Sequence, residues 1–272
     1  MNETFNFKRF WTYFKYDLKQ MWRNHAKAAI LIGGPGAILY ILWVLFSLVF
    51  TQQWTASPFI ARLVMLAIAF AILEIYQART YGHLTEKKAG SNWLMIPASR
   101  TEKFVSMLLV TLVVIPILFF AVYLVIDGFL SLVDPTFGQS IVGAVFHGAD
   151  DISYIFDQIR QESPITFTPG SMISLSLLGV AVSFMYFLLC GLCFKKNKIV
   201  GAIAILFLLS TVMSLLSALF IPQLANGLKD AASEAQFTKM MVNYMNGSVI
   251  LYILTAIGLG WGIWYRIKTL QH

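Results

Sequence analysis

The stretch that decides the fold class runs from Phe104 to Ile126 and reads FVSMLLVTLVVIPILFFAVYLVI. It contains no charged residue, and it is long enough for a helix to cross about 30 Å of hydrocarbon, which takes about 20 residues. Because lipid offers no partner for backbone N–H and C=O groups, an apolar segment that crosses it must satisfy them internally, as a helix does. The stretch therefore predicts a transmembrane helix.

Five further segments are apolar over a comparable length. The second of the six carries Arg62 near its start and Glu74 near its finish, which are candidate intramembrane charges, whereas the others carry no ionisable residue away from their ends. Of the 272 residues, 58% are hydrophobic and 12% are charged, whereas a soluble domain has about 25% charged residues. We expect an all-α polytopic membrane protein with spans near 28–50, 58–78, 104–126, 171–194, 199–220 and 248–265.

The distribution of Lys and Arg predicts the orientation of the spans. With the N-terminus inside, only Arg62, Arg160, Lys229 and Lys239 of the 20 basic residues fall outside, which is the positive-inside pattern. We therefore expect a multi-pass protein of a bacterial inner membrane, the plasma membrane, with both termini in the cytoplasm. The net charge of +7 reflects this topology, because the basic residues are spread over separate segments, and it does not indicate a nucleic-acid partner.

Residues 1–27 predict an amphipathic helix that lies on the membrane surface. Apolar and aromatic side chains recur at helical spacing on one face, and basic side chains flank or oppose them. The helix is either an anchor for the first span or a lever that transmits motion, and the sequence leaves both open. The apolar positions are Phe7, Phe10, Trp11, Phe14, Leu18, Met21 and Trp22. On the other side of the membrane we expect an external loop, 127–170, in which residues 149–162 pattern as a short amphipathic helix.

The cytoplasmic loop 79–103 carries the most specific pattern. Ser99 followed by Glu102 predicts a capping box at the start of the third span. Pro97 ends any preceding helix and favours an extended entry. The run from Trp93 to Ile96 is apolar, so we expect it to rest on the membrane, on a protein partner or against the bundle itself.

Between Glu86 and Arg100 this loop reads EKKAGSNWLMIPASR. It resembles the cytoplasmic loop of type-2 ABC exporter permeases, where a charged pair, a Gly-Ser or Gly-Thr step, a Leu and a Pro-x-Ser-Arg sequence precede the third span. The overall plan is similar too, although the external loop between spans three and four is long here. In that family the loop holds a coupling helix that docks into a groove on a cytoplasmic ATPase. By position, the resemblance implies this coupling role for Glu86, Gly90, Ser91, Trp93, Leu94, Pro97 and Arg100.

The resemblance implies the permease subunit of an exporter that forms its pathway as a dimer, with a second copy or a related permease. ATP and Mg would be bound by the separate ATPase, because the chain has no Gly-x-x-x-x-Gly-Lys phosphate loop. We expect no catalytic residue, metal site or cofactor in this chain, and lipid as a partner. The alternative is a non-transporting membrane protein, an assembly factor or a sensor subunit, that uses the loop as a docking surface.

Overall fold

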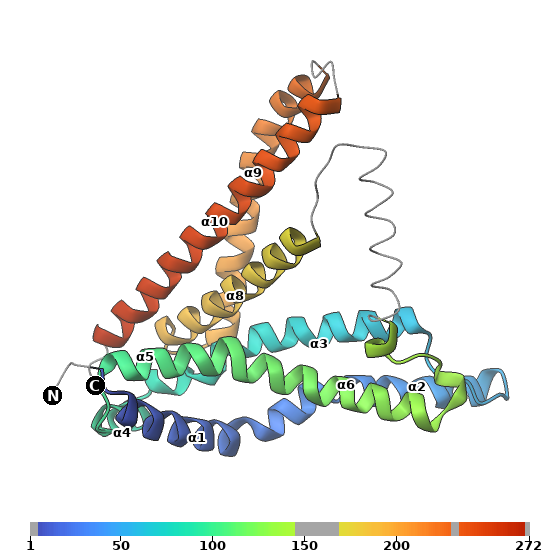
Figure 1. The fold of residues 1–272 in the computed structure, drawn as a ribbon. Helices are drawn as coiled ribbons and strands as arrows, with labels where there is room; N and C mark the ends of the chain where they lie inside the picture. The colour runs from blue at the N-terminus through green and yellow to red at the C-terminus, as the bar shows by residue number, and fades with distance from the viewer. Residues whose placement is uncertain (1–4, 145–168, 230–233, 270–272) are drawn as a thin grey trace.

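The computed structural model describes the backbone of residues 5–144, 169–229 and 234–269, and the regular secondary structure in these ranges is entirely helical (Figure 1). Four stretches of it are long and apolar enough to cross a membrane: Phe59–Thr85, Arg100–Val133, Leu175–Cys193 and Gly247–Thr269. The all-α prediction is confirmed, and the four stretches fit a membrane protein. The amphipathic helix predicted at 149–162 lies outside the described residues.

The first predicted span, 28–50, is divided in two. Helix α1 (Phe7–Gly33) continues past the predicted end of the interfacial helix, and α2 (Pro35–Phe50) begins after Gly34. The glycines here have low helix propensity, and Pro35 lacks an N–H and suits the first turn of a new helix. The 16 residues of α2 measure about 24 Å, which is shorter than the hydrocarbon core. The segment 28–50 is therefore not one continuous spanning helix.

The third predicted span is one continuous helical stretch with a local irregularity. Helix α5 (Arg100–Leu109) passes through a π-helical segment (Val110–Val114) into α6 (Ile115–Val133). Pro116 lies just beyond the π segment, and its missing N–H leaves a carbonyl one turn earlier without its usual partner. The distortion expected at this proline thus takes the form of a widened turn.

The remaining long helices are α3 (Phe59–Thr80), α8 (Pro169–Cys193), α9 (Lys198–Lys229) and α10 (Glu234–Thr269). Helix α8 packs against both α3 and α10. Helices α9 and α10 extend beyond the predicted spans 199–220 and 248–265, and Figure 1 shows their far ends standing clear of the other helices.

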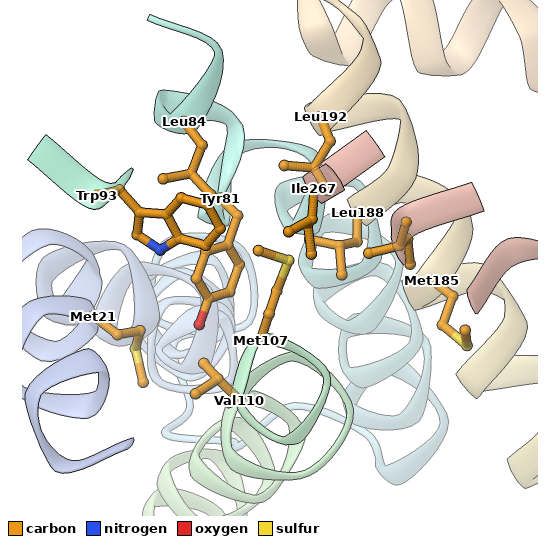
Figure 2. Close-up of a cluster of buried hydrophobic side chains, with 11 residues drawn as sticks. Met21, Tyr81, Leu84, Trp93, Met107, Val110, Met185, Leu188, Leu192 and Ile267 are labelled. Carbon is orange, nitrogen blue, oxygen red and sulfur yellow. The ribbon is translucent and has the colours of Figure 1, made fainter. Parts of the chain in front are cut away.

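The largest buried cluster gathers side chains from both halves of the chain (Figure 2). Met21 of α1 and Met107 of α5 meet Leu188 of α8 and Ile267 of α10 in it. It also includes two elements of the loop between α3 and α5, namely the 3₁₀-helix η1 (Gly82–Thr85) and the short helix α4 (Lys87–Met95). This loop is therefore part of the packed core.

A buried ion pair joins the start of α3 to the end of α6. Arg62 Nη1 lies 2.8 Å from Asp127 Oδ1, and the two side chains are 3% and 5% exposed. Arg62 also donates to the backbone oxygens of Phe137 and Gln139, and Asp127 accepts a hydrogen bond from the N–H of Ile141. An isolated arginine near the end of a span would extend towards water, whereas Arg62 is held inside the protein by these partners.

Candidate functional site

Helix α4 has an identifiable start and end in the loop between α3 and α5. Glu86 precedes it in an extended conformation, and Ile96 follows it with φ −65° and ψ 128°. The extended conformation of Ile96 is the one that a following proline imposes, because the ring of Pro97 disfavours the helical region for its neighbour. The basic, glycine-containing segment before Pro97 therefore forms a separate nine-residue helix.

The inner face of α4 is attached to the protein by specific polar contacts. Trp93 is 7% exposed, and its Nε1 donates a 3.0 Å hydrogen bond to the hydroxyl of Tyr13 in α1. The ammonium group of Lys103 donates to the backbone oxygen of Trp93 at 2.8 Å and lies 4.7 Å from the centre of its ring. Figure 2 shows Trp93 directed towards Tyr81 and into the buried cluster. Trp93 therefore points into the protein and holds the loop in place.

The outer face of the loop presents a different set of side chains. Met95 is 80% exposed, although methionine is an apolar residue. Of the predicted coupling residues, Glu86, Pro97 and Arg100 are exposed, Ser91 and Leu94 are half-buried, and Gly90 is buried next to Trp93 on the inner face. The loop thus combines an anchored inner face with an exposed outer face that carries an apolar side chain and charges of both signs.

The capping box predicted at the start of α5 is present. Glu102 N–H donates to Ser99 Oγ at 3.2 Å, and Ser99 N–H donates to Glu102 Oε2 at 2.9 Å. The Glu102 carboxylate is fully buried and also accepts hydrogen bonds from Arg9 and from the N–H of Asn6. One side chain therefore caps α5 and ties it to the segment where α1 begins, a second role that the local spacing alone does not reveal.

Asp17 of α1 is a buried polar junction that the sequence interpretation missed. It is 7% exposed, and Oδ2 accepts hydrogen bonds from Ser106 Oγ at 2.6 Å and from the hydroxyl of Tyr81 at 2.9 Å. Burial raises the pKa of this carboxyl, and the two hydrogen bonds only partly oppose the shift. The available signal was the spacing: Asp17 lies four residues after Tyr13 and four before Met21, on the stripe of α1 that is buried.

The face of α1 that packs on the protein is not the whole predicted apolar face. Phe10 and Met21 are buried, but Phe7, Trp11 and Trp22 are 70%, 46% and 58% exposed. Lys15 lies over the Trp11 ring, 5.5 Å from its centre. Exposed aromatic rings beside lysines are typical of a helix in the headgroup region of a membrane. Helix α1 therefore has one face for the protein and an apolar, basic face that lipid can contact.

Glu74 finds a partner in another helix. Glu74 was predicted as a candidate intramembrane charge, and its carboxylate accepts a 2.8 Å hydrogen bond from Ser183 Oγ of α8. This contact lies next to a largely apolar cavity of about 660 Å³ between α3, α8, α9 and α10. Within the described residues, no group of three His, Cys, Asp or Glu side chains lies close enough to hold a metal ion.

No protein-family model, curated protein or solved structure matches this chain.

Proposed function

We propose that this chain is the permease subunit of an ATP-driven ABC exporter in a bacterial inner membrane, and that it docks a separate cytoplasmic ATPase through the outer face of α4. The observation that carries the proposal is the position and attachment of α4. This short helix lies between two candidate spans and is anchored on its inner face through Trp93. Its exposed Met95 leaves an apolar side chain available to a protein partner. The loop motif from Glu86 to Arg100 agrees with this assignment.

The contacts around α4 provide a route for a mechanical coupling. A partner that moves α4 also moves α1, through the Trp93–Tyr13 hydrogen bond, and α5, through the bond from Lys103 to the backbone of Trp93. Helices α1 and α5 are joined again by Arg9–Glu102, with Arg9 Nη2 2.8 Å from Oε1. Because these elements are cross-linked by side-chain bonds, they would shift as a unit when the ATPase closes on ATP. In this scheme α1 is a lever as well as an anchor.

Copurification tests the proposal directly. An ATPase with a phosphate-binding loop, encoded beside this chain, is coexpressed with it, and the amount retained on the solubilised chain is measured. Met95→Glu and Arg100→Glu change exposed side chains of the docking face, and we expect each to reduce ATPase retention at least tenfold with normal membrane insertion. Lys268→Glu makes the same charge reversal as Arg100→Glu on an exposed residue of α10 and serves as the matched control. Failure to retain any such ATPase, or an equal effect of the control, contradicts the proposal.

ATPase stimulation separates transport from docking alone. In an exporter, a transported compound changes the rate of ATP hydrolysis by the reconstituted complex, because substrate and nucleotide favour particular conformations of the same assembly. A complex that forms through α4 but whose ATPase rate and vesicle content respond to no candidate compound would favour the assembly-factor or sensor alternative.

A further inference from the structure

A second polar site lies beside the docking loop, in a cavity of about 700 Å³. One wall comes from the end of α3 and from η1, with Tyr76, Arg79 and His83. The other wall comes from the turn between α8 and α9, where Asn197 has a positive φ of 50° and reverses the chain. This reversal places Lys195 and Lys198 on the same cavity as Arg79.

The charges around this cavity are unbalanced. It is lined by three permanently basic side chains, Arg79, Lys195 and Lys198, and by one acid, Glu86. Glu86 lies 3.7 Å from Lys198, whose ammonium group also donates to the backbone oxygen of Gly82. Within the described parts of the chain, no carboxylate lies within ion-pair distance of Arg79 or Lys195. Two cations that line one cavity without a carboxylate partner favour an anionic ligand.

Exposed apolar side chains lead away from the basic cavity along both of its helices. On α3, four residues follow one another at spacings of four, four and three and therefore share one face: Ile68, Ile72, Tyr76 and Arg79. Both isoleucines are 49% exposed. On α9, Val200 lines the cavity, and Ile203 and Phe207 follow it on the same face. Their exposed fractions are 65%, 44% and 69%. A basic pocket that continues into exposed apolar ridges is complementary to an amphiphile with an anionic head.

We propose that this cavity binds the phosphate headgroup of an anionic phospholipid, with the acyl chains lying along the exposed ridges of α3 and α9. The ridges distinguish this occupant from a soluble phosphate compound, which would gain nothing from them. They also distinguish it from an acidic protein segment, since α3 is a candidate membrane span whose exposed isoleucines would face lipid in a bilayer. The site does not depend on the docking of an ATPase, so its test is independent of the proposed function.

Native mass spectrometry of the purified full chain in mild detergent measures lipid binding. The probes are phosphatidylglycerol and phosphatidylcholine with identical acyl chains, and soluble glycerol phosphate is tested in parallel. The variants are Arg79→Gln, Lys195→Gln and their combination. Lys196→Gln is the matched control, because Lys196 is exposed in the same turn but does not line the cavity. Gel filtration and circular dichroism of each variant check that the fold is intact.

We expect the native chain and Lys196→Gln to retain phosphatidylglycerol in preference to phosphatidylcholine. Each cavity variant should weaken phosphatidylglycerol binding about fivefold, and the double variant about 25-fold, since a basic residue contributes about fivefold to the binding of an anionic lipid. Equal losses in Lys196→Gln would show diffuse surface charge and would overturn the proposal. So would equal retention of the two lipids, or binding of glycerol phosphate as tight as that of the lipid. Loss of a copurified protein with unchanged lipid binding would assign the cavity to a protein partner instead.

Discussion

Replacing Arg62 by methionine tests the buried ion pair between α3 and α6. Methionine keeps an apolar stem against Phe59 and Phe137, whose rings lie 5.2 and 4.0 Å from the guanidinium carbon. It removes the charge and the bonds to Asp127 and to two backbone oxygens. The Asp127 carboxylate then stays buried and keeps the hydrogen bond from the N–H of Ile141, but it has lost its cationic partner. Removing one partner of a buried pair costs about 3–5 kcal/mol, mostly because the other charge is left without compensation.

A double-mutant cycle separates the cost of the uncompensated Asp127 charge from the cost of the lost hydrogen bonds. Arg62→Met/Asp127→Leu removes both charges, so the uncompensated charge disappears and the main cost is the loss of hydrogen bonds to the backbone, at about 1 kcal/mol each. The double variant should therefore be less damaging than the two single changes added together, by about 3 kcal/mol or more. Ile60→Met is the matched control, because Ile60 lies on the same helix and is 74% exposed, and it should stay within about 0.5 kcal/mol of the native chain.

Reversible unfolding in mixed detergent micelles, followed by tryptophan fluorescence, measures these free energies. The reasoning is refuted if Arg62→Met lies within about 1 kcal/mol of the native chain. Simple additivity of the two single changes would equally show that the pair does not act as a unit.

Two further predictions concern other contacts of the same structure. Gly191→Ala should destabilise the protein by about 1–3 kcal/mol or more, because the new methyl group would overlap the carbonyl of Ala78 in α3. Unfolding in micelles measures this cost. Gly179→Ala is the control and should be near neutral, since a methyl group at Gly179 meets only ordinary contacts. Because burial raises the pKa of Asp17, the contribution of Asp17 to stability should be fully present below its unperturbed pKa of about 4 and should be lost as the pH rises through the raised value. Asp17→Asn should flatten this dependence in a pH series of unfolding measurements, and an unchanged slope would show that Asp17 is not its source.

The parts of the fold that the sequence predicts are those controlled by neighbouring residues. Long uncharged stretches such as 104–126 identified candidate spanning helices, and the Ser99–Glu102 spacing predicted a cap that is present. Each of these signals arises within a turn or two of helix, or from apolar length alone, so no knowledge of the tertiary fold is needed to interpret it.

The parts that could not be predicted depend on residues distant in the chain. Arg62 and Asp127 are 65 residues apart, and Glu74 and Ser183 are 109 apart, so local spacing could not pair them. Trp93 is an example of an ambiguous signal, because an apolar residue in a polar loop suits an inner contact as well as a docking surface. The structure shows the inner contact, a hydrogen bond to Tyr13, which lies 80 residues away in the chain. Asp17 was missed because its partners, Tyr81 and Ser106, lie 64 and 89 residues away in the chain.

The π-helical segment at Val110–Val114 has a consequence for how the two ends of this long stretch are oriented. A π turn holds an extra residue, so deleting one residue there would rotate α6 about its axis by about 100° relative to α5. Ser106, before the segment, bonds Asp17 of α1, and Asp127, beyond it, bonds Arg62 of α3. The widened turn sets the angular phase between these two attachments. Without the additional residue, either Ser106 or Asp127 would point away from its partner. The irregularity therefore allows one continuous helical stretch to bond two neighbouring helices that lie in different directions.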